Sequence, residues 1–131
     1  MIYCLDTNVI VRALRGMGET IRERMIAEGP ERIVVPEMVR AELLTGARVS
    51  NSPSENRVAV EQFLAAFNLL PFDHDAAEHY ADIRAALKAG GSLIGPNALL
   101  IAATARSVGA IVATGNLGEF ERVPGLRCED W

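Results

Sequence analysis

The stretch that decides the fold is Ile2-Tyr3-Cys4-Leu5-Asp6-Thr7-Asn8-Val9, near the start of this 131-residue chain. Residues 2–6 form a short apolar run that ends in an acid, which predicts a buried strand with Asp6 at its carboxyl end. In open α/β folds, ligands and catalytic groups gather at that edge of the sheet. Asp6 has no Lys or Arg beside it in the sequence. Its carboxylate is therefore expected either to be hydrated or to face a cation.

Strand-like and helix-like segments alternate along the rest of the chain. Further strands are predicted at residues 33–35, 69–72, 110–114 and 126–128. Helices are predicted at residues 7–16, 19–28, 36–48, 55–67, 75–89 and 95–108. This alternation predicts an α/β protein of one domain, a three-layer α/β/α sandwich around a central, mostly parallel sheet of four or five strands.

The composition is that of an ordinary globular domain, with 50% hydrophobic and 23% charged residues. The formal charge of −4 argues against wholesale electrostatic binding of nucleic acid. All but one of the 13 basic residues are Arg, which suits contacts to phosphate, although codon usage in a GC-rich genome is the simpler explanation. No apolar stretch is long enough to span a membrane, so we expect a cytoplasmic protein without a membrane partner.

A second unusual acid is Glu42, in the helix predicted at residues 36–48. We expect it on the inner face of that helix, which Val39, Leu43 and Gly46 define by their spacing. A carboxylate at a buried edge is costly without a partner. Either Glu42 has such a partner, or its head group reaches solvent at the rim of the stripe.

Two later segments bring further polar groups to the same edge. Residues 94–98 open an apolar helix, and the strand that ends at Thr114 is followed by a turn with Asn116 and Glu119. Each segment alone is compatible with an ordinary core helix or a Gly-Asn turn. Carboxylates that converge at one edge need a cation, and Mg²⁺ or Mn²⁺ prefers such oxygen ligands. A divalent ion held in this way can serve phosphodiester cleavage.

With these motifs the chain resembles the PIN-domain ribonucleases, and more closely the VapC-type toxins of bacterial toxin–antitoxin pairs. The resemblance covers residues 1–131 as a single PIN domain. The motifs that carry it are Leu5-Asp6-Thr7-Asn8-Val9, Glu42-Leu43-Leu44-Thr45-Gly46, Ile94-Gly95-Pro96-Asn97 with Leu100-Ile101-Ala102-Ala103, Val112-Ala113-Thr114-Gly115-Asn116 with Glu119-Phe120, and Val123-Pro124-Gly125-Leu126 with Asp130-Trp131.

The resemblance implies a metal-dependent endoribonuclease that cleaves RNA with Mg²⁺ or Mn²⁺, forms homodimers, and is held inactive by a VapB-type antitoxin. It implies metal ligands at Asp6, Glu42 and position 98. Asn116 stands where many PIN domains have a fourth acid, which makes Asn116 and the nearby Glu119 further catalytic candidates. Thr7, Asn8 and Thr114 would support the site.

Position 98 departs from the family pattern. The resemblance implies a third acid there, and this chain has Ala98 instead. Asn97 cannot replace it, being neutral and one helical position, about 100°, away. Loss of a charged ligand should weaken metal binding and slow cleavage strongly. We hypothesise that Ala98 is an engineered inactivating change, and the alternative is a natural variant that is decayed or independent of metal.

Other functions fit the sequence less well. A dehalogenase-like phosphatase needs a second acid two residues after Asp6, where this chain has Asn8. An integrin-type metal site needs hydroxyl residues at positions 8 and 10, where this chain has Asn8 and Ile10. The serious alternative is a non-catalytic, PIN-like module that binds an antitoxin or RNA. For RNA, Arg12, Arg15 and Arg48 are the predicted phosphate contacts.

Overall fold

A single five-stranded sheet organises the computed structural model, which describes residues 1–131. Its strands lie in the order β3-β2-β1-β4-β5, and every pair is parallel. The strands are β1 (Tyr3–Leu5), β2 (Ile33–Pro36), β3 (Asn68–Leu70), β4 (Ile111–Thr114) and β5 (Arg127–Asp130). The prediction of a parallel α/β sheet with four or five strands is thereby confirmed.

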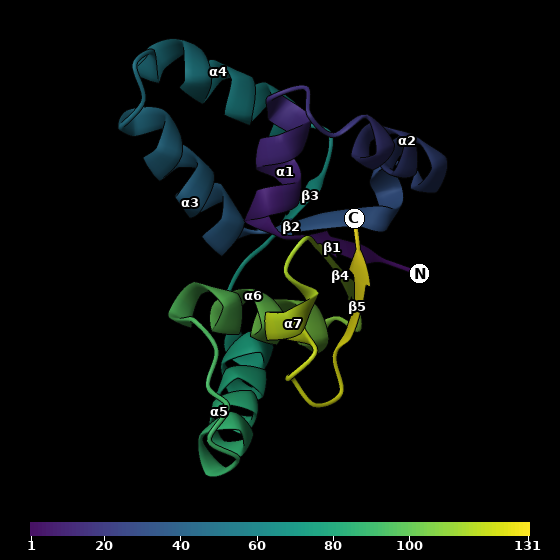
Figure 1. The fold of residues 1–131 in the computed structure, drawn as a ribbon, viewed down its shortest axis with the longest axis vertical. Helices are drawn as coiled ribbons and strands as arrows, with labels where there is room; N and C mark the ends of the chain where they lie inside the picture. Colours follow the sequence, from purple (N-terminus) through teal and green to yellow (C-terminus); the bar gives the residue numbers. More distant parts are fainter.

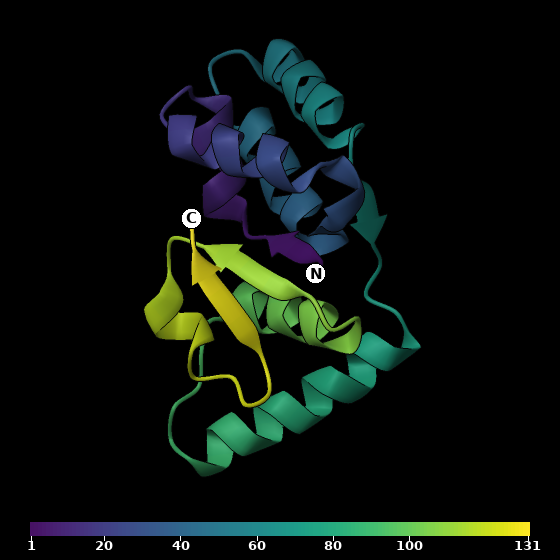
Figure 2. The same cartoon turned by 90° about the vertical axis from the view of Figure 1, so that its right-hand side faces the viewer.

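Helices cover both faces of the sheet and give three layers (Figures 1 and 2). One layer contains α1 (Thr7–Leu14), α2 (Glu19–Glu28), α3 (Glu37–Arg48) and α4 (Pro53–Leu64). On the other side lie α5 (His74–Ala89), α6 (Pro96–Ser107) and the short α7 (Leu117–Phe120). A single turn of 3₁₀ helix at Pro30–Arg32 precedes β2. None of these helices has the length and apolar character needed to cross a membrane.

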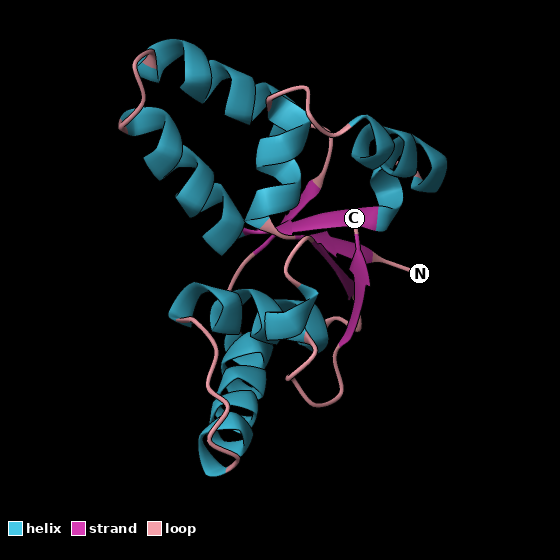
Figure 3. Ribbon diagram, in the orientation of Figure 1, coloured by secondary structure: helices cyan, strands magenta, loops and turns pink.

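The chain changes direction across the sheet between β1 and β4. The connections from β1 to β2 and from β2 to β3 run over one face, and the connection through α5 and α6 returns over the other to place β4 beside β1 (Figure 3). This reversal leaves a crevice beyond the carboxyl ends of β1 and β4, the position where open α/β sheets bind ligands. Asp6 follows β1 directly and Thr114 ends β4.

The central strands β1, β2 and β4 are buried along their whole length, whereas the edge strands β3 and β5 are partly exposed. Helix α6 is the most deeply buried helix, with six buried residues. Both observations agree with the predicted apolar runs. A sheet covered by helices on both faces has no polar face, so its central strands carry continuous rather than alternating hydrophobic residues.

Three local predictions were wrong. Pro36 ends β2 in an extended conformation (φ −64°, ψ 145°), and α3 begins one residue later. The inner face of α3 continues from Leu43 to Ala47, and Gly46 is exposed. Residues three and four positions after Leu43 both lie near that face of a helix, so the spacing alone does not decide between them. The helix predicted at residues 55–67 instead covers Pro53–Leu64, because Pro53 occupies its first turn, where a proline is well tolerated.

Candidate active site

Asp6 occupies the carboxyl end of β1 and is 7% exposed. The backbone N–H of Thr7 donates to its Oδ1 at 2.7 Å, which caps α1, and the Thr114 hydroxyl donates to its Oδ2 at 2.8 Å. Burial raises the pKa of Asp6, the two hydrogen bonds lower it, and the negative charges of Glu42 and Glu119 raise it further. Asp6 is therefore held rigidly between β1 and β4 as a carboxylate that lacks a positive partner.

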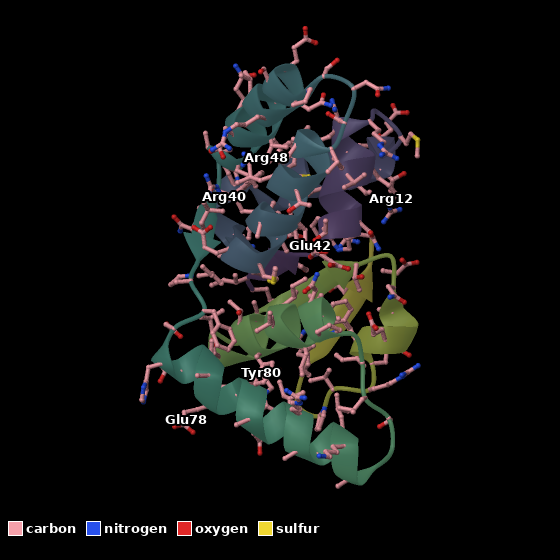
Figure 4. The ribbon with its side chains drawn as sticks, turned by 90° about the vertical axis from the view of Figure 1, so that its left-hand side faces the viewer. Arg12, Arg40, Glu42, Arg48, Glu78 and Tyr80 are labelled. Carbon is pink, nitrogen blue, oxygen red and sulfur yellow. The ribbon has the colours of Figure 1, made fainter.

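Glu42 reaches the same crevice from α3. It is half-buried, and its Oε1 accepts a hydrogen bond of 2.8 Å from the Thr7 hydroxyl. Thr7 therefore joins the two acids, with its N–H bound to Asp6 and its hydroxyl bound to Glu42. In Figure 4, Glu42 lies where the upper helices face the lower ones. Of the two alternatives left open by the sequence, Glu42 thus has a partner, which is a neutral hydroxyl rather than a cation.

Glu119 closes the opposite side of the crevice. Its Oε2 accepts from the Gly95 N–H at 3.0 Å, and its Oε1 accepts from the Asn116 amide at 3.2 Å. The Asn116 N–H donates to the Thr114 hydroxyl at 2.9 Å, and that hydroxyl in turn donates to Asp6. This network fixes the turn after β4 to the start of α6 and to Asp6.

These groups surround one pocket of about 250 Å³. Its lining consists of Asp6, Thr7, Asn8, Glu42, Gly95, Pro96, Asn97, Ala98, Ile101, Asn116, Glu119 and Phe120. Seven residues that the sequence placed in the site thus meet in one pocket, and Thr114 lies behind Asp6. The methyl group of Ala98 packs against the core and adds no polar atom at this point of the wall.

The chemistry of this lining fits a divalent cation bound by few protein ligands. Three carboxylates and three Asn side chains line the pocket, and no Lys, Arg or His does. No three acidic, His or Cys side chains are close enough to form a complete protein cage. Mg²⁺ usually keeps several waters and binds through one or two carboxylates together with substrate phosphates. Asp6 and Glu42, joined by Thr7, are the pair that suits such an ion.

None of the three predicted RNA-contacting arginines lines this pocket. Arg12 donates to the backbone carbonyl of Trp131 at 2.5 Å, so its guanidinium is engaged within the protein. Arg15 is exposed and lines a neighbouring groove between α1, α3 and α4 that also reaches Glu42. Arg48 is exposed near the end of α3, well away from Glu42 in Figure 4. Arg15 is thus the arginine of the three that connects most directly to the acids.

Two features of the site were not predicted from the sequence. One is the hydrogen bond from Gly95 to Glu119, which joins residues 24 positions apart. The other is Asn97, which is exposed, lines the pocket and makes no side-chain hydrogen bond within the protein. The only sequence signal for the first was the Gly-Pro pair, which marks the start of α6 and leaves the Gly95 N–H outside the helix ladder.

Comparison with known proteins agrees with this architecture. The sequence profile of the PIN domain matches residues 3–126. The chain is 40% identical over 129 residues to the tRNA(fMet)-specific endonuclease VapC of Salmonella typhimurium, covering 98% of this chain and 97% of that protein. It is also 38% identical over 129 residues to Ribonuclease VapC2 of Haemophilus influenzae, with the same coverage of both proteins.

Solved structures of VapBC complexes also resemble this chain closely. The structure of DNA-bound VapBC from Salmonella typhimurium superposes with a TM-score of 0.95 at 39% identity, over 100% of this chain and 98% of that one. VapBC2 from Rickettsia felis, bound to a promoter DNA fragment, superposes with a TM-score of 0.92 at 32% identity, over 100% and 99% of the two chains. The chain therefore belongs to the PIN-domain family, within its VapC branch.

Proposed function

We propose that this protein is the toxin of a VapBC-type toxin–antitoxin pair, an endoribonuclease that depends on Mg²⁺ or Mn²⁺ and cleaves RNA phosphodiester bonds. The observation that carries this proposal is the pocket in which Asp6, Glu42 and Glu119 converge without a basic residue. Such a pocket suits a cation that a phosphate can share. The name of the Salmonella relative makes tRNA(fMet) the first RNA to test, and a tRNA substrate implies a cytoplasmic protein.

The residues divide into those that would hold the metal and those that position them. Asp6 and Glu42 would hold the ion, which when bound activates water and neutralises charge on the phosphate. Thr7 orients Glu42, and Thr114 fixes the Asp6 carboxylate against β4. Asn116 and Glu119 hold the turn after β4 against α6. Asn8 adds a neutral amide to the pocket wall.

We further propose that Ala98 leaves this site impaired. Ala98 lines the acid pocket, where the resemblance implies a third metal-binding carboxylate. With Ala98, only Asp6 and Glu42 remain as the linked pair of acids. Our hypothesis is still that the residue is an engineered inactivating change, with a natural weakened variant as the alternative.

Restoring the acid tests this proposal. Ala98→Asp should bind Mg²⁺ more tightly in calorimetric titration and should gain Mg²⁺-dependent cleavage of tRNA by at least about tenfold, as expected when a charge-assisted ligand is worth more than about 1.4 kcal/mol. Ala98→Asn is the matched control, because it has almost the same shape without the charge. If Ala98→Asp and Ala98→Asn cleave equally poorly, the proposal for position 98 is wrong.

A second candidate function is the non-catalytic module that binds an antitoxin or RNA. The observation that favours it is the neutral Ala98 in the wall of the acid pocket, if that residue is natural. Such a module would gain neither Mg²⁺ affinity nor cleavage from Ala98→Asp, and it would not become toxic to growing cells. The same titration therefore separates the two functions.

The partners follow from the relatives. The Salmonella and Rickettsia structures are of VapBC bound to DNA. We propose a VapB-type antitoxin as the partner of this chain, and a homodimer as its own assembly. Co-expression with a VapB-type antitoxin should give a stable complex in size-exclusion chromatography with light scattering, and the chain alone should have twice its monomer mass of 14.1 kDa.

A further inference from the structure

A second pocket, of about 300 Å³, adjoins the acid pocket between α3 and α6. Its lining consists of Met38, Ala41, Glu42, Thr45 and Asn97. Glu42 and Asn97 also line the acid pocket, so the two pockets are continuous around these two side chains. In Figure 1, α3 lies directly above α6, and the second pocket is formed where the two helices face each other.

The polar groups of this second pocket are few and available. The Asn97 side chain is exposed and has no hydrogen-bond partner in the protein, so its amide offers one donor group and one acceptor group. The Thr45 hydroxyl donates to the Ala41 carbonyl at 2.9 Å, which leaves only its lone pairs for a ligand. The Asn97 amide is therefore the group best able to recognise the edge of a ligand.

The apolar part of the pocket comes from Met38 and Ala41. Met38 is partly buried and packs against the hydrophobic core, which gives the pocket a fixed apolar wall. A methionine thioether is polarizable and makes favourable contacts with aromatic rings, often at the ring edge. The wall therefore offers a surface for a planar ring, although no aromatic side chain lines the pocket.

The charge of the pocket selects against phosphate. Glu42 is its only charged residue, and no Lys or Arg lines it. A phosphate here would meet an uncompensated carboxylate, whereas a neutral planar group would meet an amide and a thioether. The volume lies at the lower end of the range of small-ligand pockets, roughly 300–1,000 Å³.

We propose that this pocket is a base-recognition subsite, which seats the nucleobase next to the scissile phosphate of the RNA. The base packs against Met38, and Asn97 hydrogen-bonds to its edge. Asparagine pairs well with base edges, and single-stranded RNA is read through bases that are splayed out in this way. This inference rests on the proposed ribonuclease function. Asn97 would be the residue that sets which base is accepted.

Binding of short RNAs tests the subsite. Fluorescein-labelled RNA hexamers, in which each position in turn carries A, C, G or U, are titrated against this chain and followed by anisotropy. We expect the chain to prefer one base at one position by about tenfold or more. Asn97→Ala should reduce that preference to less than about twofold, with selectivity at the other positions unchanged. Met38→Ala should weaken all four bases at that position alike, by about two- to tenfold.

Matched control variants are available on exposed parts of the surface. Asn51→Ala and Met17→Ala make the same chemical changes outside both pockets and should leave every affinity unchanged. If Asn97→Ala keeps the base preference of the unmodified chain, the subsite is wrong while the proposed function stands. If neither this chain nor Ala98→Asp binds any hexamer or tRNA(fMet), the RNA-directed function itself is wrong.

Discussion

At the scale of single residues, the carboxylate of Asp6 is a site where function opposes stability. It is 7% exposed, both of its oxygens accept hydrogen bonds from neutral groups, and it lies near Glu42 and Glu119. Burial, the largest effect, raises its pKa above the ordinary value of 3.8. The folded protein thus favours the protonated form more than the unfolded chain does. As pH rises through the folded-state pKa, Asp6 ionises and stability is lost.

Asp6→Asn should therefore stabilise the protein at neutral pH in EDTA. The amide can keep the hydrogen bond from the Thr7 N–H and can donate to the Thr114 hydroxyl, while the buried charge is removed. A gain of about 1 kcal/mol would raise Tm by about 3–5 °C in a domain of this size. The gain should shrink as the pH falls toward 4, where Asp6 itself becomes protonated. Thermal unfolding between pH 4 and 8 measures both effects.

The control for this substitution is Asp130→Asn, an identical change at an exposed residue without a hydrogen bond from its side chain. It should leave the difference between pH 4 and pH 8 unaltered. A lower Tm for Asp6→Asn than for the unmodified chain at pH 7 would contradict the view that the ionised carboxylate costs stability.

At the scale of elements, Arg106 connects α6 to α5 and to the loop before β5. From the last turn of α6 it donates to His79 Nδ1 at 2.8 Å and to Asp82 at 2.6 Å, both on α5, and to the Pro124 carbonyl at 2.9 Å. Its side chain is only 15% exposed, whereas that of Asp82 is 70% exposed. The partly buried bond to His79 is therefore expected to matter more than the ion pair or the bond to Pro124, since exposed interactions contribute little.

Arg106→Ala should lower the free energy of unfolding by roughly 1–3 kcal/mol, because it leaves the partly buried His79 Nδ1 without its donor and removes a side chain that is only 15% exposed. Asp82→Asn should change it by less than about 1 kcal/mol, because only an exposed pair is weakened. Urea denaturation of the two variants measures the contrast. Equal losses would show that the ion pair, not the fork across three segments, holds α5 to α6.

The positions of the strands could be predicted from the sequence better than the exact ends and faces of the helices. Buried strands and their order along the chain were predictable, because a sheet covered on both faces requires continuous apolar runs. The end of β2 at Pro36 was not predictable, because a proline at this point can be either the last extended residue or the first helical one. The exposure of Gly46 was not predictable, because Gly46 and Ala47 are both small and uncharged and either could continue the inner face of α3. In the structure Ala47 is the buried residue.

At the scale of the whole molecule, the convergence of acids was predictable and their local partners were not. Asp6 and Thr114 meet because parallel strands end at one edge, a consequence of topology alone. The bonds from Thr7 to Glu42 and from Gly95 to Glu119 depend on how helices tilt and loops close. The hydrogen bond from Arg12 to the Trp131 carbonyl also depends on how the loops close. Because of this bond, Arg12 is not free to make the phosphate contact predicted for it.

The net charge of −4 means that any binding of RNA must depend on a few local arginines rather than on the overall field. Arg15 is exposed and lines a groove of about 270 Å³ that shares Glu42 with the acid pocket. A strand of RNA that leaves the acids along this groove would pass Arg15. Each phosphate neutralised on a single strand contributes about 0.7 to the slope of log affinity against log salt.

Arg15→Gln should therefore reduce that slope by about 0.7, the contribution of one phosphate contact. The control is Arg32→Gln, since Arg32 is exposed and directly precedes β2, at the amino ends of the strands and on the opposite edge from the acids. Both variants carry the same net charge, so a difference between them reports position and not overall charge. Affinity for tRNA(fMet), measured by anisotropy between 50 and 300 mM KCl, gives both slopes. Equal slopes for the two variants would mean that RNA does not follow the groove past Arg15.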